Sequence, residues 1–181
     1  MLRIVGGKYR HLLISAPEIS STRPTTDKVR EALMSALGMS LKDAVVLDLF
    51  AGSGALGLEA LSRGSKKAYF CDNNMLAYKT IKNNIEKLRI DEEVEVIFGD
   101  YLSALKKIKD KGEKIDIVFL DPPYAKEEVY DKVTDYLLEC DMLSEKAIIV
   151  KEWNKVNNID ERFTSHKSYK YGKVNILIER R

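Results

Sequence analysis

The segment from Asp121 to Tyr124 places two prolines between an acid and a tyrosine, directly after an apolar run. The Asp121 carboxylate and the Pro122 carbonyl are hydrogen-bond acceptors, and neither proline has an N–H that would compete as a donor. Pro123 keeps Pro122 extended, and the ring of Tyr124 can stack on a base. Such a set can orient an exocyclic amine of a nucleobase for alkylation. A rigid turn capped by Asp121 is the other interpretation of these four residues alone.

A glycine-rich segment, DLFAGSGALG, follows another apolar run. Gly52 and Gly54 let the backbone turn sharply and approach a ligand closely. The G-x-G-x-x-G spacing that starts at Gly52, with Asp72 after the next apolar run, is also typical of a dinucleotide site. A nicotinamide-dependent oxidoreductase is therefore an alternative at this point.

Acidic residues near these turns favour a different ligand. Asp48, just before the glycines, would repel a pyrophosphate at a helix N-terminus. It suits a ligand that carries an ammonium group and a positive sulfur. Asp100, after a third apolar run, is placed to accept from an adenine amino group. The acids therefore favour S-adenosyl-L-methionine, whose sulfonium is already an activated electrophile, so that no metal is expected.

Strand-like and helix-like segments alternate along the chain and position these residues. The predicted strands are Val45–Leu49, Ala68–Cys71, Val94–Phe98, Ile115–Leu120 and Ala147–Val150. The predicted helices lie around Ala55–Ser62, Leu76–Leu88, Tyr101–Ile108 and Val129–Cys140, and an earlier one starts after Thr25 or Thr26. This alternation predicts a parallel sheet covered on both faces, with ligands at the carboxyl ends of its strands. A short hairpin around Gly6-Gly7 and a closing hairpin, about 164–168 and 174–179, complete the expected α/β fold.

Length and composition predict one domain: 181 residues with 45% hydrophobic and 32% charged residues. Residues 1–24 would form a basic hairpin and loop, and residues 25–181 the catalytic core. The two cysteines, Cys71 and Cys140, lack metal-like spacing and are expected to be reduced thiols. No signal peptide or membrane span is recognisable, so we expect a cytoplasmic protein without a membrane partner.

Positive charge gathers at the N-terminal end. The net charge is +2, but residues 1–30 carry +4 and the other 151 residues −2. A basic front on a slightly acidic body suggests a polyanion bound from one side, although a solvated terminal segment has the same charge pattern. The expected phosphate contacts are Lys8, Arg10, Arg23 and Arg30.

Taken together, the motifs resemble a known family. IVGGKYR, TRPTTDKVREAL, the glycine segment, DPPY and YGKVNILI are similar to motifs of the bacterial 16S rRNA guanine-N2 methyltransferases of the RsmD type. These belong to the class I S-adenosylmethionine-dependent methyltransferases. The resemblance covers nearly the whole chain, and RPTTDKVREAL is its most discriminating part.

The resemblance implies a Rossmann-like, mostly parallel seven-stranded sheet with helices on both faces and a C-terminal antiparallel hairpin. It also implies a monomeric enzyme that methylates a guanine of 16S rRNA, either free or in the assembling small ribosomal subunit. Asp121, Pro122, Pro123 and Tyr124 would hold that guanine. The implied cofactor-binding residues are Asp48, Phe50, Gly52, Ser53, Gly54, Asp72, Asn73, Asp100 and Tyr101.

Two residues depart from the family pattern. His11 stands where a glycine is usual, and Asn74 stands where an acid is common. The remaining alternatives are amino-methylation of DNA adenine or cytosine or of a protein glutamine, the nicotinamide-dependent oxidoreductase, and an RNA-binding module without catalysis.

Overall fold

The computed structural model describes residues 1–18, 26–122, 127–153, 159–172 and 174–181. A seven-stranded sheet in the order β5-β4-β3-β6-β7-β9-β8 forms its centre. Its parallel strands are β3 (Val45–Asp48), β4 (Lys67–Asp72), β5 (Glu93–Phe98), β6 (Ile115–Leu120) and β7 (Leu143–Trp153). Two antiparallel strands, β8 (Ser165–Tyr171) and β9 (Val174–Arg180), close one side. The predicted fold class is confirmed.

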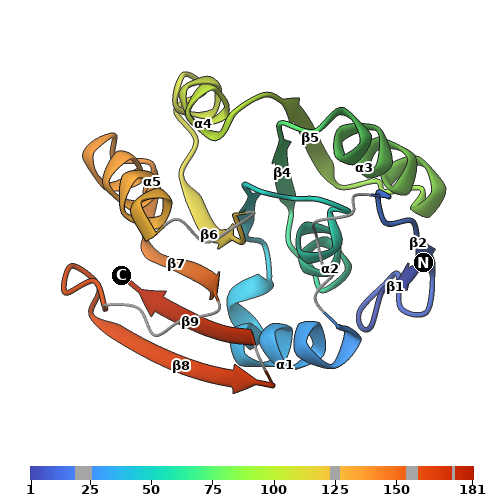
Figure 1. Cartoon of the computed structure of the whole chain (residues 1–181), viewed down its shortest axis with the longest axis horizontal. Coiled ribbons are helices and arrows are strands. Elements are labelled where there is room, and N and C mark those ends of the chain that lie inside the picture. Colours follow the sequence, from blue (N-terminus) through green and yellow to red (C-terminus); the bar gives the residue numbers. More distant parts are fainter. Residues whose placement is uncertain (19–25, 123–126, 154–158, 173) are drawn as a thin grey trace.

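Helices cover both faces of this sheet, as Figure 1 shows. One face carries α1 (Asp27–Leu37), α2 (Ala55–Ser62) and α3 (Met75–Leu88), and the other carries α4 (Tyr101–Lys109) and α5 (Glu127–Glu139). A short 3-10 helix (Gly38–Leu41) follows α1. Two hydrophobic cores result, because strands of a covered parallel sheet bury side chains on both faces.

The sequence predicted the positions of these elements closely. Helix α2 has the predicted bounds, and α3 and α4 each differ from prediction by one residue at one end. The largest difference is β7, which begins at Leu143 rather than at Ala147. Thr26 stands at the N-cap of α1 as predicted, but its side chain accepts no capping hydrogen bond.

The N-terminal hairpin consists of two antiparallel two-residue strands, β1 (Leu2–Arg3) and β2 (Leu13–Ile14). Its turn keeps the shape that a glycine favours, because His11 has a φ of 71° in the left-handed region. The His11 N–H donates to the Ile4 carbonyl at 2.8 Å, which helps to hold that conformation. The departure from the family pattern therefore leaves the backbone in a glycine-like turn.

Helix α2 approaches β4 so closely that Gly57 leaves no room for a side chain. A Cβ added there would lie 2.3 Å from Cε1 of Phe70. We expect Gly57→Ala to destabilise the fold by about 1–3 kcal/mol, because overpacking outweighs the better helix propensity of alanine. Urea unfolding measures this change.

A second substitution separates packing from propensity. On a Phe70→Leu background the ring atoms that cause the contact are gone, so Gly57→Ala should then be neutral or stabilising. Equal stabilities of Gly57→Ala and the parent protein would contradict the close approach.

Candidate functional site

Acidic residues from four adjacent strands share the carboxyl edge of the parallel sheet. Asp48 ends β3 and Asp72 ends β4, while Asp100 follows β5 and Asp121 follows β6. Parallel strands end at the same side of a sheet, and ligands of open α/β sheets bind there. The topology therefore brings together four acids that are spread over more than seventy positions of the chain.

The glycine segment forms the turn between β3 and α2. Gly52 has a φ of 54°, and a Cβ added to it would meet no atom within 4 Å, so the backbone here borders open space. The Gly52 N–H donates to Asp72 Oδ2 at 2.9 Å, and the Ala51 N–H donates to the Cys71 carbonyl at 2.9 Å. Gly54, with a φ of 76°, leads into α2. The loop is thus fastened to β4 while one side of its backbone stays accessible to a ligand.

Asp48 is a buried carboxylate beneath this loop, with 3% of its surface exposed. Its Oδ2 accepts from the Gly57 N–H at 3.0 Å, inside the first turns of α2. Burial raises the pKa of Asp48 to about 7, the Gly57 hydrogen bond opposes that rise, and the charge of Asp72 adds to it. A nearby cation would favour the ionised form, so the carboxylate suits a positively charged ligand group.

Asp72 and Asp100 both accept backbone hydrogen bonds near the start of the helices that follow them. Asp72 Oδ1 accepts from the Asn74 N–H at 2.8 Å. Asp100 caps α4 by accepting from the N–H groups of Leu102 and Ser103, both at 3.0 Å. The hydrogen bond from the Ser103 hydroxyl is the main cause that lowers the pKa of Asp100, and the hydrogen bond from the Ser103 N–H lowers it further. Each carboxylate oxygen has more than one acceptor site, so these bonds leave capacity for a ligand.

Asn74, the departure from the family pattern, has a structural role. It is the N-cap of α3, and its Oδ1 accepts from the N–H groups of Leu76 at 2.8 Å and Ala77 at 3.4 Å. Asparagine and aspartate cap helices about equally well. An asparagine in place of the usual acid therefore preserves the start of α3. Asn73, which precedes Asn74, is exposed at the same edge of the sheet.

Two aromatic rings from different elements lie beside the glycine loop and α4. Phe50 and Tyr101 have ring centroids 5.8 Å apart at an angle of 49°, and both are half-buried. Ser53 is half-buried, and its carbonyl accepts from Asn84 Nδ2 at 3.0 Å. The predicted cofactor residues thus lie on the glycine loop, at the tip of β4 and at the start of α4.

Asp121 and Pro122 lie just past the end of β6, whereas Pro123 and Tyr124 lie outside the described residues. Asp121 keeps an exposed surface, but the surrounding protein removes much of the water around its carboxylate. This burial is the main reason that the pKa of Asp121 lies well above its usual value, and the charges of Glu152 and Asp48 raise it further. Glu152 is close because Leu120 of β6 pairs with Lys151 of β7.

The predicted RNA contacts differ in their surroundings. Arg10 is exposed, and Lys8 is exposed but forms ion pairs with Asp91 and, at 3.3 Å, with Glu92. Arg23 lies outside the described residues. The local negative charge partly compensates Lys8, so Arg10 is the more available cation of the two.

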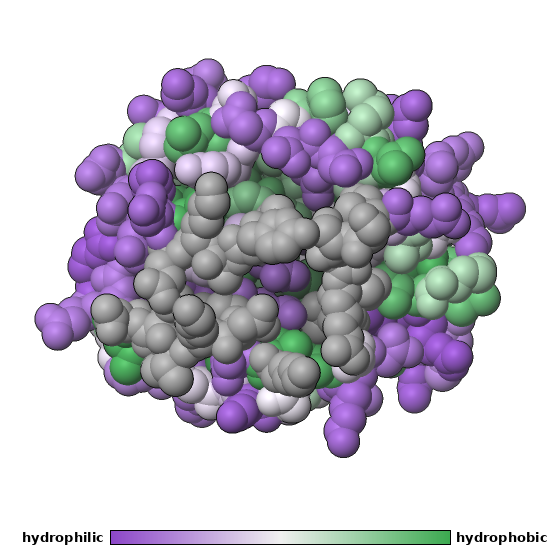
Figure 2. All heavy atoms as spheres, viewed as in Figure 1, coloured by the Kyte–Doolittle hydropathy of each residue, from purple (hydrophilic) through white to green (hydrophobic). Residues whose placement is uncertain are grey.

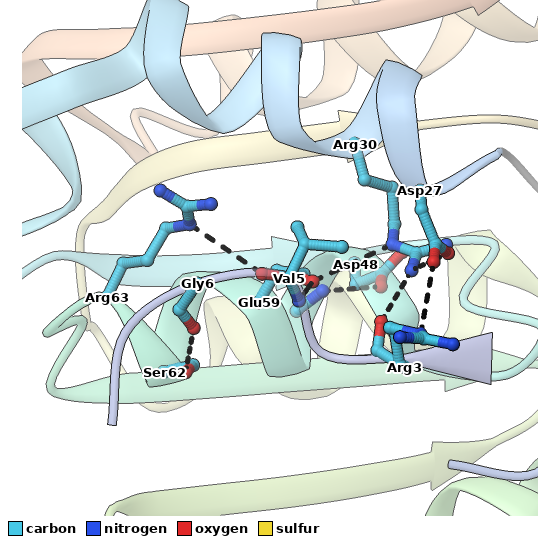
Figure 3. A network of polar contacts seen from close by, with 10 residues as sticks. Arg3, Val5, Gly6, Asp27, Arg30, Asp48, Glu59, Ser62 and Arg63 are labelled. Carbon is cyan, nitrogen blue, oxygen red and sulfur yellow. Dashed lines mark hydrogen bonds and ion pairs between the residues drawn. The ribbon is translucent and has the colours of Figure 1, made fainter. Parts of the chain in front are cut away.

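Arg30 requires a correction, because its side chain is buried with 0% of its surface exposed. Figure 3 shows its guanidinium between the N-terminal hairpin and α2: Nη2 donates to the Arg3 carbonyl at 2.7 Å and to Asp27 Oδ1 at 2.8 Å. Its Nε lies 3.8 Å from Oε1 of the buried Glu59. In this conformation Arg30 joins elements of the fold and presents no charge to a phosphate.

Figure 2 shows mainly hydrophilic residues around the face viewed in Figure 1, with a hydrophobic area beside the N-terminal hairpin. Met1, Leu12 and Leu13 are exposed hydrophobic residues of that hairpin.

Over the described part of the chain, no helix has the length and apolar character needed to cross a bilayer.

Three polar residues near the site were not identified from the sequence: Glu59, Asn84 and Glu152. Two of them carried a signal that could have been found. Asn84 occupies the buried face of α3 in line with Ala77 and Ile81, and Glu59 stands within the apolar helix α2. A polar residue at an apolar position of a helix is expected to have a specific hydrogen-bond partner. Glu152 gave no such signal, because its role depends on the neighbouring strand.

Comparison with known proteins adds to this geometry. The family described as Conserved hypothetical protein 95 matches residues 2–180. The YlbH protein of Bacillus subtilis is 36% identical over 160 residues, which cover 88% of this chain and 86% of YlbH. Ribosomal RNA small subunit methyltransferase D of Escherichia coli K12 is 34% identical over 158 residues, which cover 87% of this chain and 77% of that protein.

A solved structure agrees with these relatives. The yhhF protein of Escherichia coli superimposes with a TM-score of 0.84 at 30% identity, covering 99% of this chain and 97% of that chain. The match over almost the whole length and the identities to curated relatives confirm the resemblance seen in the motifs. This chain therefore belongs to the RsmD-type family of ribosomal RNA small subunit methyltransferases.

Proposed function

We propose that this protein transfers a methyl group from S-adenosyl-L-methionine to the exocyclic N2 amino group of a guanine in 16S rRNA. The observation that carries this function is the position of Asp121-Pro122 at the same sheet edge as the glycine loop and three further acids, in a member of this family. The relatives named as small subunit rRNA methyltransferases support the choice of rRNA.

The residues at this edge fit the proposed cofactor. S-adenosylmethionine supplies, when bound, a methyl group on a positively charged sulfur. Asp48, whose carboxylate is buried beside the loop, would favour its ammonium end, and the open side of Gly52 would let its backbone approach. Asp72 would hold the ribose hydroxyls, and Asp100 would accept from the adenine amino group. Three carboxylates suit this ligand better than the pyrophosphate of NAD.

The protein's own contribution to the reaction would be alignment. Asp121 would accept one N–H of the guanine amine, and the Pro122 carbonyl the other, so that the nitrogen lone pair points toward the bound cofactor. Holding two reactants in such a geometry can contribute about 7–11 kcal/mol to lowering the barrier. The guanine must first leave its stack, which costs a few kcal/mol unless it is already unpaired.

The proposed function is tested by methyl transfer from tritium-labelled S-adenosylmethionine. The substrates are 16S rRNA, free or in partly assembled small subunits, from cells that lack this gene. Digestion to nucleosides and mass spectrometry should show N2-methylguanosine, and mass mapping of ribonuclease fragments should place it at one position. Duplex DNA should receive no label. Label in N6-methyladenine or N4-methylcytosine of DNA would favour the alternative amino-methyltransferase, and calorimetric binding of NAD in place of S-adenosylhomocysteine would favour the oxidoreductase.

The position of Arg10 predicts how rRNA binding depends on salt. Arg10→Ala should reduce the slope of log K against log salt concentration by about 1, because one phosphate contact is lost. Lys8→Ala should have a smaller effect, since Asp91 and Glu92 already neutralise part of that charge. Lys109→Ala, an exposed change at the far end of α4, is the control. Filter binding at several salt concentrations measures the slopes, and an unchanged slope for Arg10→Ala would remove this residue from the interface.

A further inference from the structure

Asn84 is a buried polar residue of α3 whose side chain joins two distant parts of the chain. None of its surface is exposed. Its Oδ1 accepts from the Ser15 N–H at 2.8 Å, and its Nδ2 donates to the Ser15 carbonyl at 2.9 Å and to the Ser53 carbonyl at 3.0 Å. Both amide hydrogens and the amide oxygen are therefore used.

The two partners have different places in the proposed function. Ser53 belongs to the glycine loop, which would hold the cofactor. Ser15 comes directly after β2, at the end of the N-terminal hairpin, and this hairpin carries the exposed Arg10. Since Asn84 contacts only backbone groups of Ser15 and Ser53, it holds the backbone at both positions independently of their side chains.

Helix α2 fastens the same hairpin on its other side. The N–H groups of Val5 and Tyr9 donate to Glu59 Oε1 and to Ser62 Oγ, at 2.5 and 2.9 Å. The Ser62 hydroxyl donates to the Gly6 carbonyl, as Figure 3 shows. The hairpin thus rests on α2, which begins directly after the glycine loop, and on α3 through Asn84. A short series of hydrogen bonds therefore connects the glycine loop to the hairpin, so a change in the loop conformation can affect the hairpin.

We infer that Asn84 is a positioning residue that couples the cofactor loop to the N-terminal hairpin, so that cofactor binding steadies the surface that contacts RNA. The RNA part of this coupling rests on the proposed function, and the part between loop and hairpin does not. Without the Asn84 amide, the Ser15 and Ser53 carbonyls lose a buried donor, and the loop populates its binding conformation less often. Apparent cofactor affinity falls in proportion to that population.

The first test uses the unaltered protein and S-adenosylhomocysteine. Hydrogen exchange followed by NMR should show slower exchange of the Ser15 amide when this compound is bound, because the loop and the hairpin are ordered together. Exchange that slows in residues 50–54 but not at Ser15 would overturn the coupling, whatever the protein's substrate is.

The second test compares asparagines that are neighbours in the sequence. Asn84→Asp keeps the size and the acceptor but removes both donors, and Asn83→Asp makes the same exchange at an exposed position of α3. We expect S-adenosylhomocysteine to bind about tenfold more weakly to Asn84→Asp and equally well to Asn83→Asp. The slowing of Ser15 exchange should also be lost in Asn84→Asp at concentrations that saturate it. Retention of both properties in Asn84→Asp would overturn the inference.

A third measurement concerns RNA. Saturating S-adenosylhomocysteine should raise the affinity of the unaltered protein for 16S rRNA, and by linkage the rRNA should raise its affinity for the compound by the same factor. In Asn84→Asp this factor should approach one. Absence of rRNA binding in every variant would count against the proposed function. The hydrogen-exchange results alone would then decide whether Asn84 couples the glycine loop to the hairpin. Binding with an equal factor in both proteins would contradict the RNA part of the inference.

Discussion

Replacing Asp121 with alanine is expected to slow methyl transfer to rRNA by about a hundredfold or more, with the affinity for S-adenosylhomocysteine changed less than about twofold. Alanine has no side-chain atom that accepts a hydrogen bond, so one N–H of the target amine would lose its proposed partner. Alanine also carries no negative charge. The substitution therefore removes the proposed acceptor and leaves the glycine loop and the acids around it unchanged. Single-turnover rates with labelled cofactor measure the loss.

A matched control makes this result specific. Asp131→Ala makes the same exchange at an exposed position of α5 and should leave the rate unchanged. Because burial and the charges of Glu152 and Asp48 raise the pKa of Asp121 well above its usual value, the rate of the unaltered protein should increase with pH as this carboxyl group ionises and then level off. A rate for Asp121→Ala within about threefold of the parent would refute the role of this acid as acceptor.

The fold was predictable because its signals are local. Apolar runs of strand length alternated with helical patterns, and glycines stood at the turn from β3 to α2, where left-handed backbone angles are needed. Strand order was not available from those signals, and the seven-stranded sheet came from the family resemblance. The early start of β7 at Leu143 depends on pairing with Ile115 of β6, which is a tertiary contact.

Charged and polar side chains were harder to place, since sequence shows their type but not their partners. Arg30 stands in a basic segment and was expected at the surface, but Glu59, twenty-nine positions later, lies beside it in the interior. Asp100 was assigned to a ligand from its place after a strand, and the structure adds its function as the cap of α4. In both cases a residue has a structural partner that a charge count cannot reveal.

Asp48→Asn is expected to stabilise the protein at neutral pH and to weaken its binding of S-adenosylmethionine. In the folded protein the pKa of Asp48 is raised from 3.8 to about 7, so between these values the folded state binds more protons than the unfolded chain. Stability then falls as pH rises through this window and stays level above it. At pH 8 the ionised carboxylate costs up to about 4 kcal/mol, which asparagine avoids while its Oδ1 still accepts from the Gly57 N–H.

The advantage of Asp48→Asn should therefore grow from nearly zero at pH 4 to its full value at pH 8, as measured by urea unfolding at each pH. Asp48→Asn should weaken cofactor binding although it stabilises the fold. The affinity of the variant should be about tenfold lower than that of the parent at pH 8 but little lower at pH 5.5, where Asp48 of the parent is already protonated. Asp43→Asn is the control, because it removes an exposed charge before the same strand, at a positive φ that asparagine tolerates. If Asp48→Asn unfolded more easily than the parent at pH 8, the ionised Asp48 carboxylate would stabilise the folded protein. The proposal that it is buried at a cost in stability in order to bind a cationic ligand would then be wrong.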